Sequence, residues 1–177
     1  MALKSTIYKV ALTVADIDRG HYADYALTVA RHPSETDERL MVRVLIFAMH
    51  AHEHLELGKG VSSAEEPDLW RKDLTGVIEE WIELGQPDEK AVMRACGRAK
   101  AVFVYAYGGG AMPWWKGVAE GLERAKNLSV RKLELGESGA LAALADRTFA
   151  LQATIQDGQV LLSNDRGSLA VDVVTLR

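Results

Sequence analysis

The chain has 177 residues, of which 48% are hydrophobic, and these values suit one globular domain over residues 1–177 with a sizeable core. Its 21 basic and 25 acidic residues give a formal net charge of −4, which argues against tight non-specific DNA binding but says nothing about a local basic patch. No apolar run approaches the ~18 residues of a membrane span, and no signal peptide opens the chain. The single cysteine, Cys96, excludes an internal disulfide. We therefore expect a soluble, cytoplasmic protein that does not bind membranes.

The first third of the chain predicts a hairpin followed by a helix. Apolar residues alternate over residues 5–14, and a turn at 16–20 leads to a second strand over 21–31. Ser34 is a suitable N-cap, with Asp37 at the third helical position, and a helix is expected to run to about His50.

The rest of the chain predicts two strand–helix–strand units and a set of terminal strands. Pro87 suits the first position of a helix that ends near residue 98 or 99, and a strand over 101–107, a helix over 113–125 and a strand over 128–135 follow. A short helix over 137–146 precedes strands at 147–155, 160–163 and 169–176, with Asp157-Gly158 as a hairpin turn. The expected fold class is α/β, with a central mixed sheet flanked by helices and β-hairpins at both ends.

The most informative stretch is a hairpin expected within residues 67–84. If Leu74 and Thr75 form a two-residue loop, Asp68 pairs with Trp81, and Asp68, Glu79 and Glu83 share one face of the hairpin. Asp68 and Glu83 then become diagonal neighbours that could reach one cation. The three carboxylates repel one another unless a metal, a basic group or protonation offsets their charge.

Several blocks of sequence resemble the bacterial YaeQ family in order and over nearly the whole chain. They are ARHPSET at 30–36 with Glu38-Arg39, EPDLW at 66–70, WIELGQPDEK at 81–90, VYAYG at 104–108, NLSV at 127–130 and LQATIQDG at 151–158. The resemblance implies a variant of the PD-(D/E)XK nuclease core, also called the restriction-endonuclease-like fold. The family supplies no established reaction, and kinship of fold is only an analogy for function.

The resemblance also implies a set of metal ligands. Pro67-Asp68 matches the PD element, and Glu83 matches the acidic residue of (D/E)XK. Glu38 resembles the extra glutamate that many nucleases of this fold add to the metal shell. The implied ion is Mg²⁺ or Mn²⁺, which would polarise the scissile phosphate and activate a water.

The motif lysine is missing from its usual place, because Gly85 stands two residues after Glu83. Lys90, one turn into the next helix, and Lys100 are candidates to replace it, with the role of stabilising negative charge or orienting the nucleophile. Gln86 resembles a helix-leading glutamine of some members. The candidate catalytic residues are therefore Asp68, Glu83, Lys90 and Gln86.

Two functions from different classes follow. The chain is either a metal-dependent nuclease or related phosphodiesterase, or an inactive nuclease-like scaffold that binds a nucleic acid or a protein partner. A solvated charged sheet face, with the glutamates paired to Arg and Lys, is the non-functional alternative. If the carboxylates do crowd one another, alanine at Asp68 should leave the melting temperature unchanged or raised.

The remaining motifs favour structural roles. His50, His52 and His54 do not form an HExxH pattern, and no cysteine cluster completes a zinc site. The glycines at 108–110 are not followed by Lys-Ser/Thr, so they do not form a P-loop. The tryptophan pairs could stack bases, but such spacings are more typical of a core.

Overall fold

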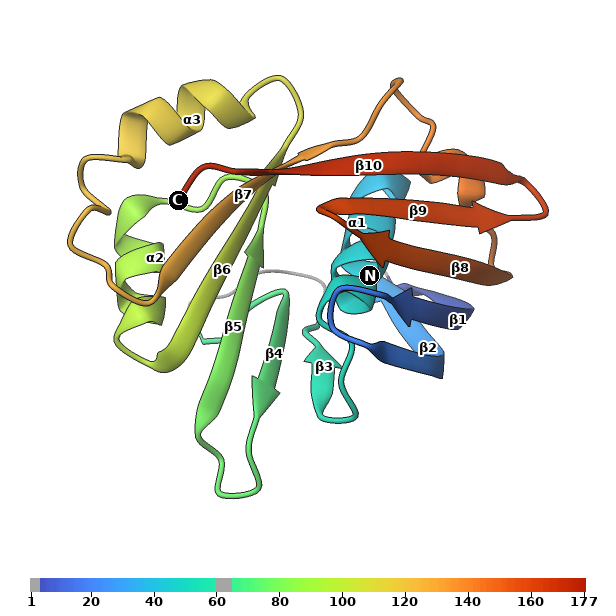
Figure 1. Ribbon diagram of the computed structural model, residues 1–177, viewed down its shortest axis with the longest axis horizontal. Helices are drawn as coiled ribbons and strands as arrows, with labels where there is room; N and C mark the ends of the chain where they lie inside the picture. Colours follow the sequence, from blue (N-terminus) through green and yellow to red (C-terminus); the bar gives the residue numbers. More distant parts are fainter. Residues whose placement is uncertain (1–3, 60–64) are drawn as a thin grey trace. The chain divides into compact units, whose positions relative to one another are not determined.

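The computed structural model describes residues 4–59 and 65–177, which form two compact units (Figure 1). Of these residues, the first unit contains 4–51, 59 and 135–172, and the second contains 52–58, 65–134 and 173–177. The fold is mixed α/β, as expected from the sequence. No helix in the described parts of the chain has the length and apolar character needed to cross a membrane.

The first unit is a sheet with one long helix. Its elements are β1 (Thr6–Asp16), β2 (His21–Arg31), α1 (Asp37–Met49), a 3-10 turn (Ala142–Leu144), β8 (Thr148–Gln156), β9 (Gln159–Asn164) and most of β10 (Gly167–Thr175). The strands lie in the order β2-β1-β8-β9-β10, and β1 is parallel to β8 while the other pairs are antiparallel. Asp157 and Gly158 both have positive φ values, 52° and 75°, as a tight hairpin turn requires.

The core of the first unit follows from the alternation of the strands. Val10, Leu12 and Val14 of β1 are buried, while the residues between them are exposed or half-buried. Helix α1 is buried over the whole stretch from Leu40 to Ala48, and its sequence there is accordingly almost entirely apolar.

The second unit carries the parallel strands. Its elements are β3 (Leu55–Leu57), β4 (Leu69–Lys72), β5 (Ile78–Leu84), α2 (Glu89–Cys96), β6 (Ala99–Tyr107), α3 (Ala111–Val118) and β7 (Leu128–Glu134), with the strand order β7-β6-β5-β4-β3. Strands β5, β6 and β7 are parallel, and β4 is antiparallel to β5. This arrangement confirms the two strand–helix–strand units predicted from the sequence.

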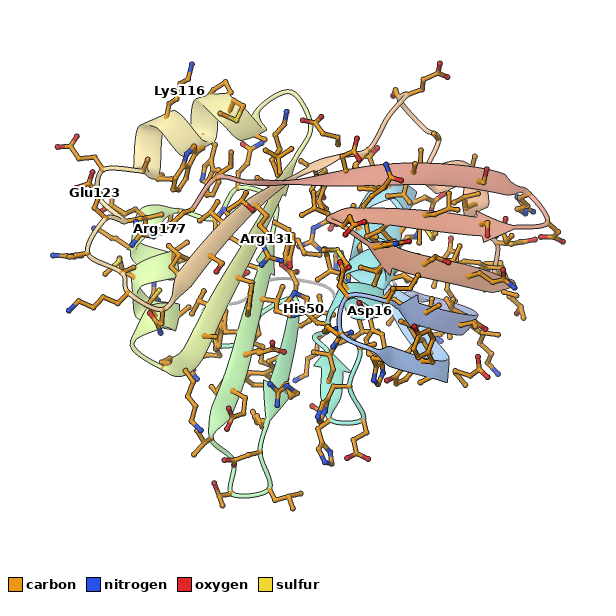
Figure 2. All side chains as sticks on the ribbon, in the orientation of Figure 1. Asp16, His50, Lys116, Glu123, Arg131 and Arg177 are labelled. Atoms are coloured by element: carbon orange, nitrogen blue, oxygen red, sulfur yellow. The ribbon has the colours of Figure 1, made fainter. Side chains whose placement is uncertain are left out.

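One face of this sheet packs against the helices. Trp81, Val102, Val104 and Val130 from the strands form a buried cluster with Val92 of α2, Leu122 after α3 and other apolar residues. The last residues of the chain close this unit, because the Leu176 amide donates to the Val130 carbonyl (2.8 Å). The Arg177 guanidinium donates to the carbonyls of Glu123 (2.9 Å) and Ala125 (Figure 2).

Two helix starts differ from the prediction. Helix α1 is capped by Thr36, whose hydroxyl accepts from the Arg39 amide, and not by Ser34. Ser34 is instead bound to the imidazole of His32, 2.6 Å away. Helix α2 is capped by Asp88, so Pro87 lies outside the helix.

Two predicted helices are shorter than expected. Residues 137–146 form only a 3-10 turn, because Gly136 and Gly139 adopt φ values of 72° and 83° that a helix cannot contain. Helix α3 ends at Val118 and is followed by turns to residue 124.

Candidate functional site

The hairpin between β4 and β5 has a different register from the one expected. The amide of Asp73 donates to the Val77 carbonyl (2.9 Å), so the loop contains three residues, with Gly76 at φ 90°. A bulge between Arg71 and Lys72 then shifts the pairing by one further residue. The prediction that Asp68 pairs with Trp81 is therefore wrong.

The observed register brings the two motif carboxylates closer than predicted. Trp70 pairs with Trp81 and Leu69 with Ile82, so Asp68 and Glu83 follow as the next opposed positions instead of diagonal ones. Asp68 is 2% exposed and Glu83 is 8% exposed. Two acidic side chains thus lie buried on adjacent strands, at the carboxyl end of the parallel strand β5.

Fixed donors hold both carboxylates. The backbone amide of Leu84 donates to Oδ2 of Asp68 (2.8 Å), and the indole Nε1–H of Trp81 donates to Oε1 of Glu83 (2.8 Å). These two hydrogen bonds fix the orientation of the carboxylates. They also mean that a cation is not the only group that offsets the charge.

A pair of tryptophans with two cations lies next to the carboxylates. The Trp70 and Trp81 rings meet edge to face with centroids 5.8 Å apart. The Lys72 ammonium lies 3.7 Å from the centroid of the Trp70 ring, and the Arg98 guanidinium lies 4.9 Å from that of the Trp81 ring. Because Trp81 also donates to Glu83, the cation–π cluster is joined directly to the carboxylate pair.

Glu79, the third carboxylate of the predicted acidic face, is paired with a lysine. It is the extra residue of the bulge in the β4–β5 pairing, and its carboxylate forms an ion pair with Lys100 (2.7 Å), so a basic group offsets its charge. This hydrogen bond raises the pKa of Lys100 above its ordinary value. Lys100 is therefore bound to Glu79, four residues along the strand from the position opposite Glu83.

Gly85 follows β5 with a φ of 90°, and among the described residues only its own chain neighbours lie within 4 Å of the position that a Cβ would take there. Its amide donates to the Tyr105 carbonyl (2.8 Å), which extends the β5–β6 ladder. Gln86 lies against Gly110, since a Cβ on Gly110 would stand 2.7 Å from the amide nitrogen of Gln86. Lys90 is exposed on the first turn of α2.

Glu38 is half-buried on α1, in the first unit, whereas Asp68, Glu83, Gln86 and Lys90 all belong to the second. The contacts described above therefore all involve residues of the second unit. Within residues 4–59 and 65–177, no three His, Cys, Asp or Glu side chains form a group arranged to hold a metal ion.

The hydrogen bond to Leu84 changes the expectation for Asp68→Ala. Alanine would relieve the repulsion with Glu83 but would leave a buried amide without its acceptor, and the second effect costs about 1–3 kcal/mol. We now expect the alanine variant to be less stable than wild type.

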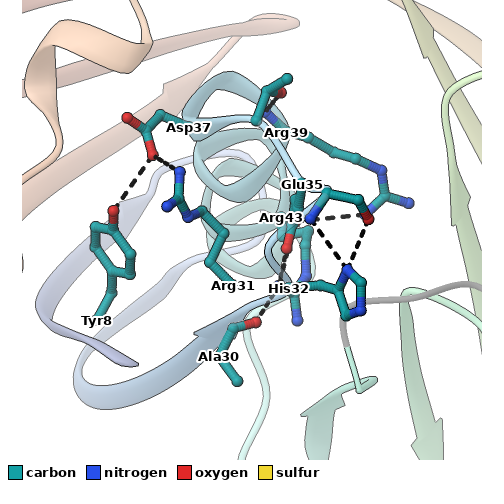
Figure 3. Close-up of polar contacts among 10 residues, drawn as sticks. Tyr8, Ala30, Arg31, His32, Glu35, Asp37, Arg39 and Arg43 are labelled. Atoms are coloured by element: carbon teal, nitrogen blue, oxygen red, sulfur yellow. Dashed lines mark hydrogen bonds and ion pairs between the residues drawn. The ribbon is translucent and has the colours of Figure 1, made fainter. Parts of the chain in front are cut away.

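Sequence reasoning missed a buried ion pair in the first unit (Figure 3). Nη1 of Arg43 lies 3.3 Å from both carboxylate oxygens of Glu35 and donates to the Ala30 carbonyl (3.1 Å). Arg43 is 1% exposed and Glu35 is 7% exposed. Arg39 adds a longer contact to Glu35 (3.5 Å). The only available signal was an arginine in an otherwise apolar helical run, and it points to a structural lock between α1 and the end of β2.

The other motifs have local roles. His50 is the C-cap of α1, and the His54 amide donates to Nδ1 of His52 (3.0 Å). Burial, with the charge of Arg71, lowers the pKa of His52. Trp114 donates its indole N–H to the Pro87 carbonyl (2.8 Å) and so ties α3 to the start of α2.

Comparison with known proteins identifies the family of this chain. The family model described as "YaeQ protein" matches residues 1–173. Proteins named "Uncharacterized protein YaeQ" from Salmonella typhi and Escherichia coli K12 are 46% and 45% identical, over 98% of this chain and 96% of their own length.

Two crystal structures of YaeQ proteins have the same fold. The one from Xanthomonas axonopodis pv. citri is 46% identical with a TM-score of 0.93, and the match covers 98% of both chains. The one from Pseudomonas syringae is 35% identical with a TM-score of 0.89, covering 98% of this chain and 96% of that one. The chain belongs to the YaeQ family.

Proposed function

We propose that the chain is a metal-dependent nuclease or related phosphodiesterase, with a variant PD-(D/E)XK site in which Asp68 and Glu83 bind Mg²⁺ or Mn²⁺. One observation carries the proposal: two nearly fully buried carboxylates occupy opposed positions on adjacent strands. They lie at the carboxyl end of a parallel strand, which is the edge of a sheet where open α/β folds bind their ligands.

The donor chemistry fits a hard cation. Mg²⁺ is bound by oxygen ligands and commonly takes only one or two carboxylates, with waters in its other positions. The Leu84 amide and the Trp81 indole would orient the two ligands, as outer-sphere hydrogen bonds do in metal sites. When bound, the ion would polarise a phosphoryl oxygen and lower the pKa of an attacking water. Glu38 remains the proposed third carboxylate.

The remaining proposed roles belong to the loop and helix that follow β5. Gly85 provides no side chain, and Lys100 is held by Glu79, so Lys90 is the proposed cation beside the transferred phosphate. Gln86, which packs against Gly110, would position the β5–α2 connection at the mouth of the site. A hairpin followed by parallel strands with a helical crossover supports the proposed restriction-endonuclease-like core. Action on nucleic acid inside the cell fits the lone Cys96 and a cytoplasmic location.

A second function, an inactive nuclease-like scaffold that binds a nucleic acid or a protein, is favoured by the glycine at position 85. A scaffold that has lost its motif lysine could keep the fixed carboxylates as structural acceptors for Leu84 and Trp81. The two functions differ in whether the folded protein binds a divalent cation.

The test is thermal unfolding with EDTA, Mg²⁺ or Mn²⁺ for wild type, Asp68→Asn and Glu83→Gln. Glu56→Gln, an exposed change on β3, is the matched control. A cation at 100 times its Kd stabilises the folded state by about 2.7 kcal/mol, which corresponds to roughly 5–11 °C for a chain of this size. We expect the rise in wild type and Glu56→Gln alone, together with metal-dependent cleavage of DNA or RNA. No rise at millimolar metal would overturn the enzyme proposal and leave the scaffold.

A further inference from the structure

We propose that the exposed face of α2 binds the backbone of a single-stranded nucleic acid. Lys90, Arg94 and Arg98 stand four residues apart along α2 and its C-terminal turn, and all three are exposed. Residues at this spacing lie on one face of a helix, about 6 Å apart along the axis. We call these three residues the α2 cationic stripe. The net charge of −4 for the whole chain gives no indication of this local group of cations.

Lys90 and Arg94, the two residues of the stripe within α2, have little compensation from acidic groups. Among the described residues, neither Lys90 nor Arg94 takes part in an ion pair. Asp88 is occupied as the N-cap, where it accepts from the Ala91 amide (2.8 Å). The carboxylate of Glu89 lies against Gly121, on another side of the helix, since it fills the space that a Cβ on Gly121 would take.

The arrangement is unfavourable for the helix itself. Like charges at i and i+4 destabilise a helix by a few tenths of a kcal/mol. Lys90 also stands in the first turn, where the helix dipole disfavours a cation. Charge arrangements that destabilise their own helix are expected where the surface has a function.

The stripe continues into the tryptophan pair. Arg98 stacks on Trp81, Trp81 meets Trp70, and Lys72 covers Trp70, so these four side chains form one chain of contacts. Trp70 is half-buried at the surface of this cluster. Cations that flank a half-buried aromatic ring suit a strand whose phosphates and unpaired bases are both accessible. Trp81 also contacts Glu83, which connects the stripe to the carboxylate pair.

A nucleic acid fits better than a membrane or a protein. None of the exposed large apolar side chains in the described part of the chain belongs to α2, as insertion into lipid would need. Protein interfaces have an apolar centre depleted in charge, and this face has the opposite character. A regular polyanion matches a line of evenly spaced cations.

The inference rests on the proposed function for its substrate, but binding can be measured without cleavage. Fluorescence anisotropy of a labelled 20-nucleotide DNA strand in EDTA would compare wild type with Lys90→Gln/Arg94→Gln. Lys4→Gln/Lys9→Gln, two exposed lysines of the first unit, removes the same charge elsewhere.

We expect the stripe variant to bind at least about tenfold more weakly at 100 mM salt, with a salt slope smaller by about 1.4 for two lost phosphate contacts. The control variant should keep the wild-type slope, and a duplex of the same sequence should bind wild type more weakly than the single strand. Equal losses in both variants, no binding by wild type, or tighter binding of the duplex would overturn the inference. If the stripe variant binds as tightly as wild type while the metal still stabilises wild type, this inference alone is refuted. If the stripe variant loses binding as expected but the metal does not stabilise wild type, the proposed function alone is refuted.

Discussion

Replacement of Asp68 by alanine or by asparagine separates the structural role of this residue from its proposed metal-binding role. The Asp68 carboxylate accepts a hydrogen bond from the Leu84 amide and is 2% exposed. Hydrogen bonds to charged groups contribute about 1.5–3 kcal/mol, and part of the loss is offset by relief of the repulsion with Glu83. Alanine should therefore reduce the free energy of unfolding by about 1–3 kcal/mol, which lowers Tm by roughly 2–12 °C.

Asparagine should have almost no such cost. Its amide oxygen can accept from the Leu84 amide in the same position, and it carries no charge to repel Glu83. Urea unfolding in EDTA measures both variants without any cation. An alanine variant as stable as wild type would refute the reasoning, because the Leu84 hydrogen bond would then contribute nothing. An asparagine variant as unstable as alanine would show that the negative charge itself, and not the acceptor, stabilises the fold.

Three further predictions concern the rest of the chain. Removing the charge of Arg43 with methionine should cost about 3–5 kcal/mol by leaving Glu35 buried without its partner, and Glu35→Gln in addition should recover part of it in urea unfolding. The Thr75 hydroxyl and nearby amides lower the pKa of Asp73, so this carboxylate stabilises the hairpin above its unfolded pKa and ceases to do so as pH falls through the lower folded value. Thr75→Val should raise that pKa in an NMR titration, and an unchanged pKa would contradict the assignment. Burial raises the pKa of the Cys96 thiol, so it should react with a thiol reagent at pH 8 more slowly than after unfolding in urea.

The elements of the second unit could be predicted because local signals agree with the tertiary structure. An apolar run ends at Tyr107, and three glycines separate it from the next helix, so the βαβ pattern was readable. The prediction of a helix over residues 137–146 was wrong because local signals conflict there. The Ala/Leu content favours a helix, but Gly136 and Gly139 have positive φ values. The backbone conformation of this segment is therefore set by two glycines and not by its overall composition.

The carboxylate pair was found, but its geometry was not. The sequence Asp73-Leu74-Thr75-Gly76 is compatible with a two-residue or a three-residue loop, and only the positive φ of Gly76 selects the latter. A bulge has no sequence signature of its own, and here it leaves Glu79 without an opposed residue on β4, while Lys100 pairs with its carboxylate. Two shifts of one residue each restore the faces of Asp68 and Glu83, because side chains alternate with a period of two. The pair therefore survived an error in the register.

The topology explains why Lys90, the first residue of the α2 cationic stripe, lies at the same end of the sheet as the proposed metal site. A helix that connects two parallel strands must run back along them, so α2 begins where β5 ends and finishes where β6 begins. Lys90 therefore lies at the start of α2, shortly after Glu83 and Gly85 in the sequence. Arg98, after the other end of the helix, contacts the Trp81 ring. A strand bound along the helix would approach the carboxylates without a lysine at position 85. Under the proposed function, the cations of α2 would supply the positive charge that Gly85 does not provide on the strand.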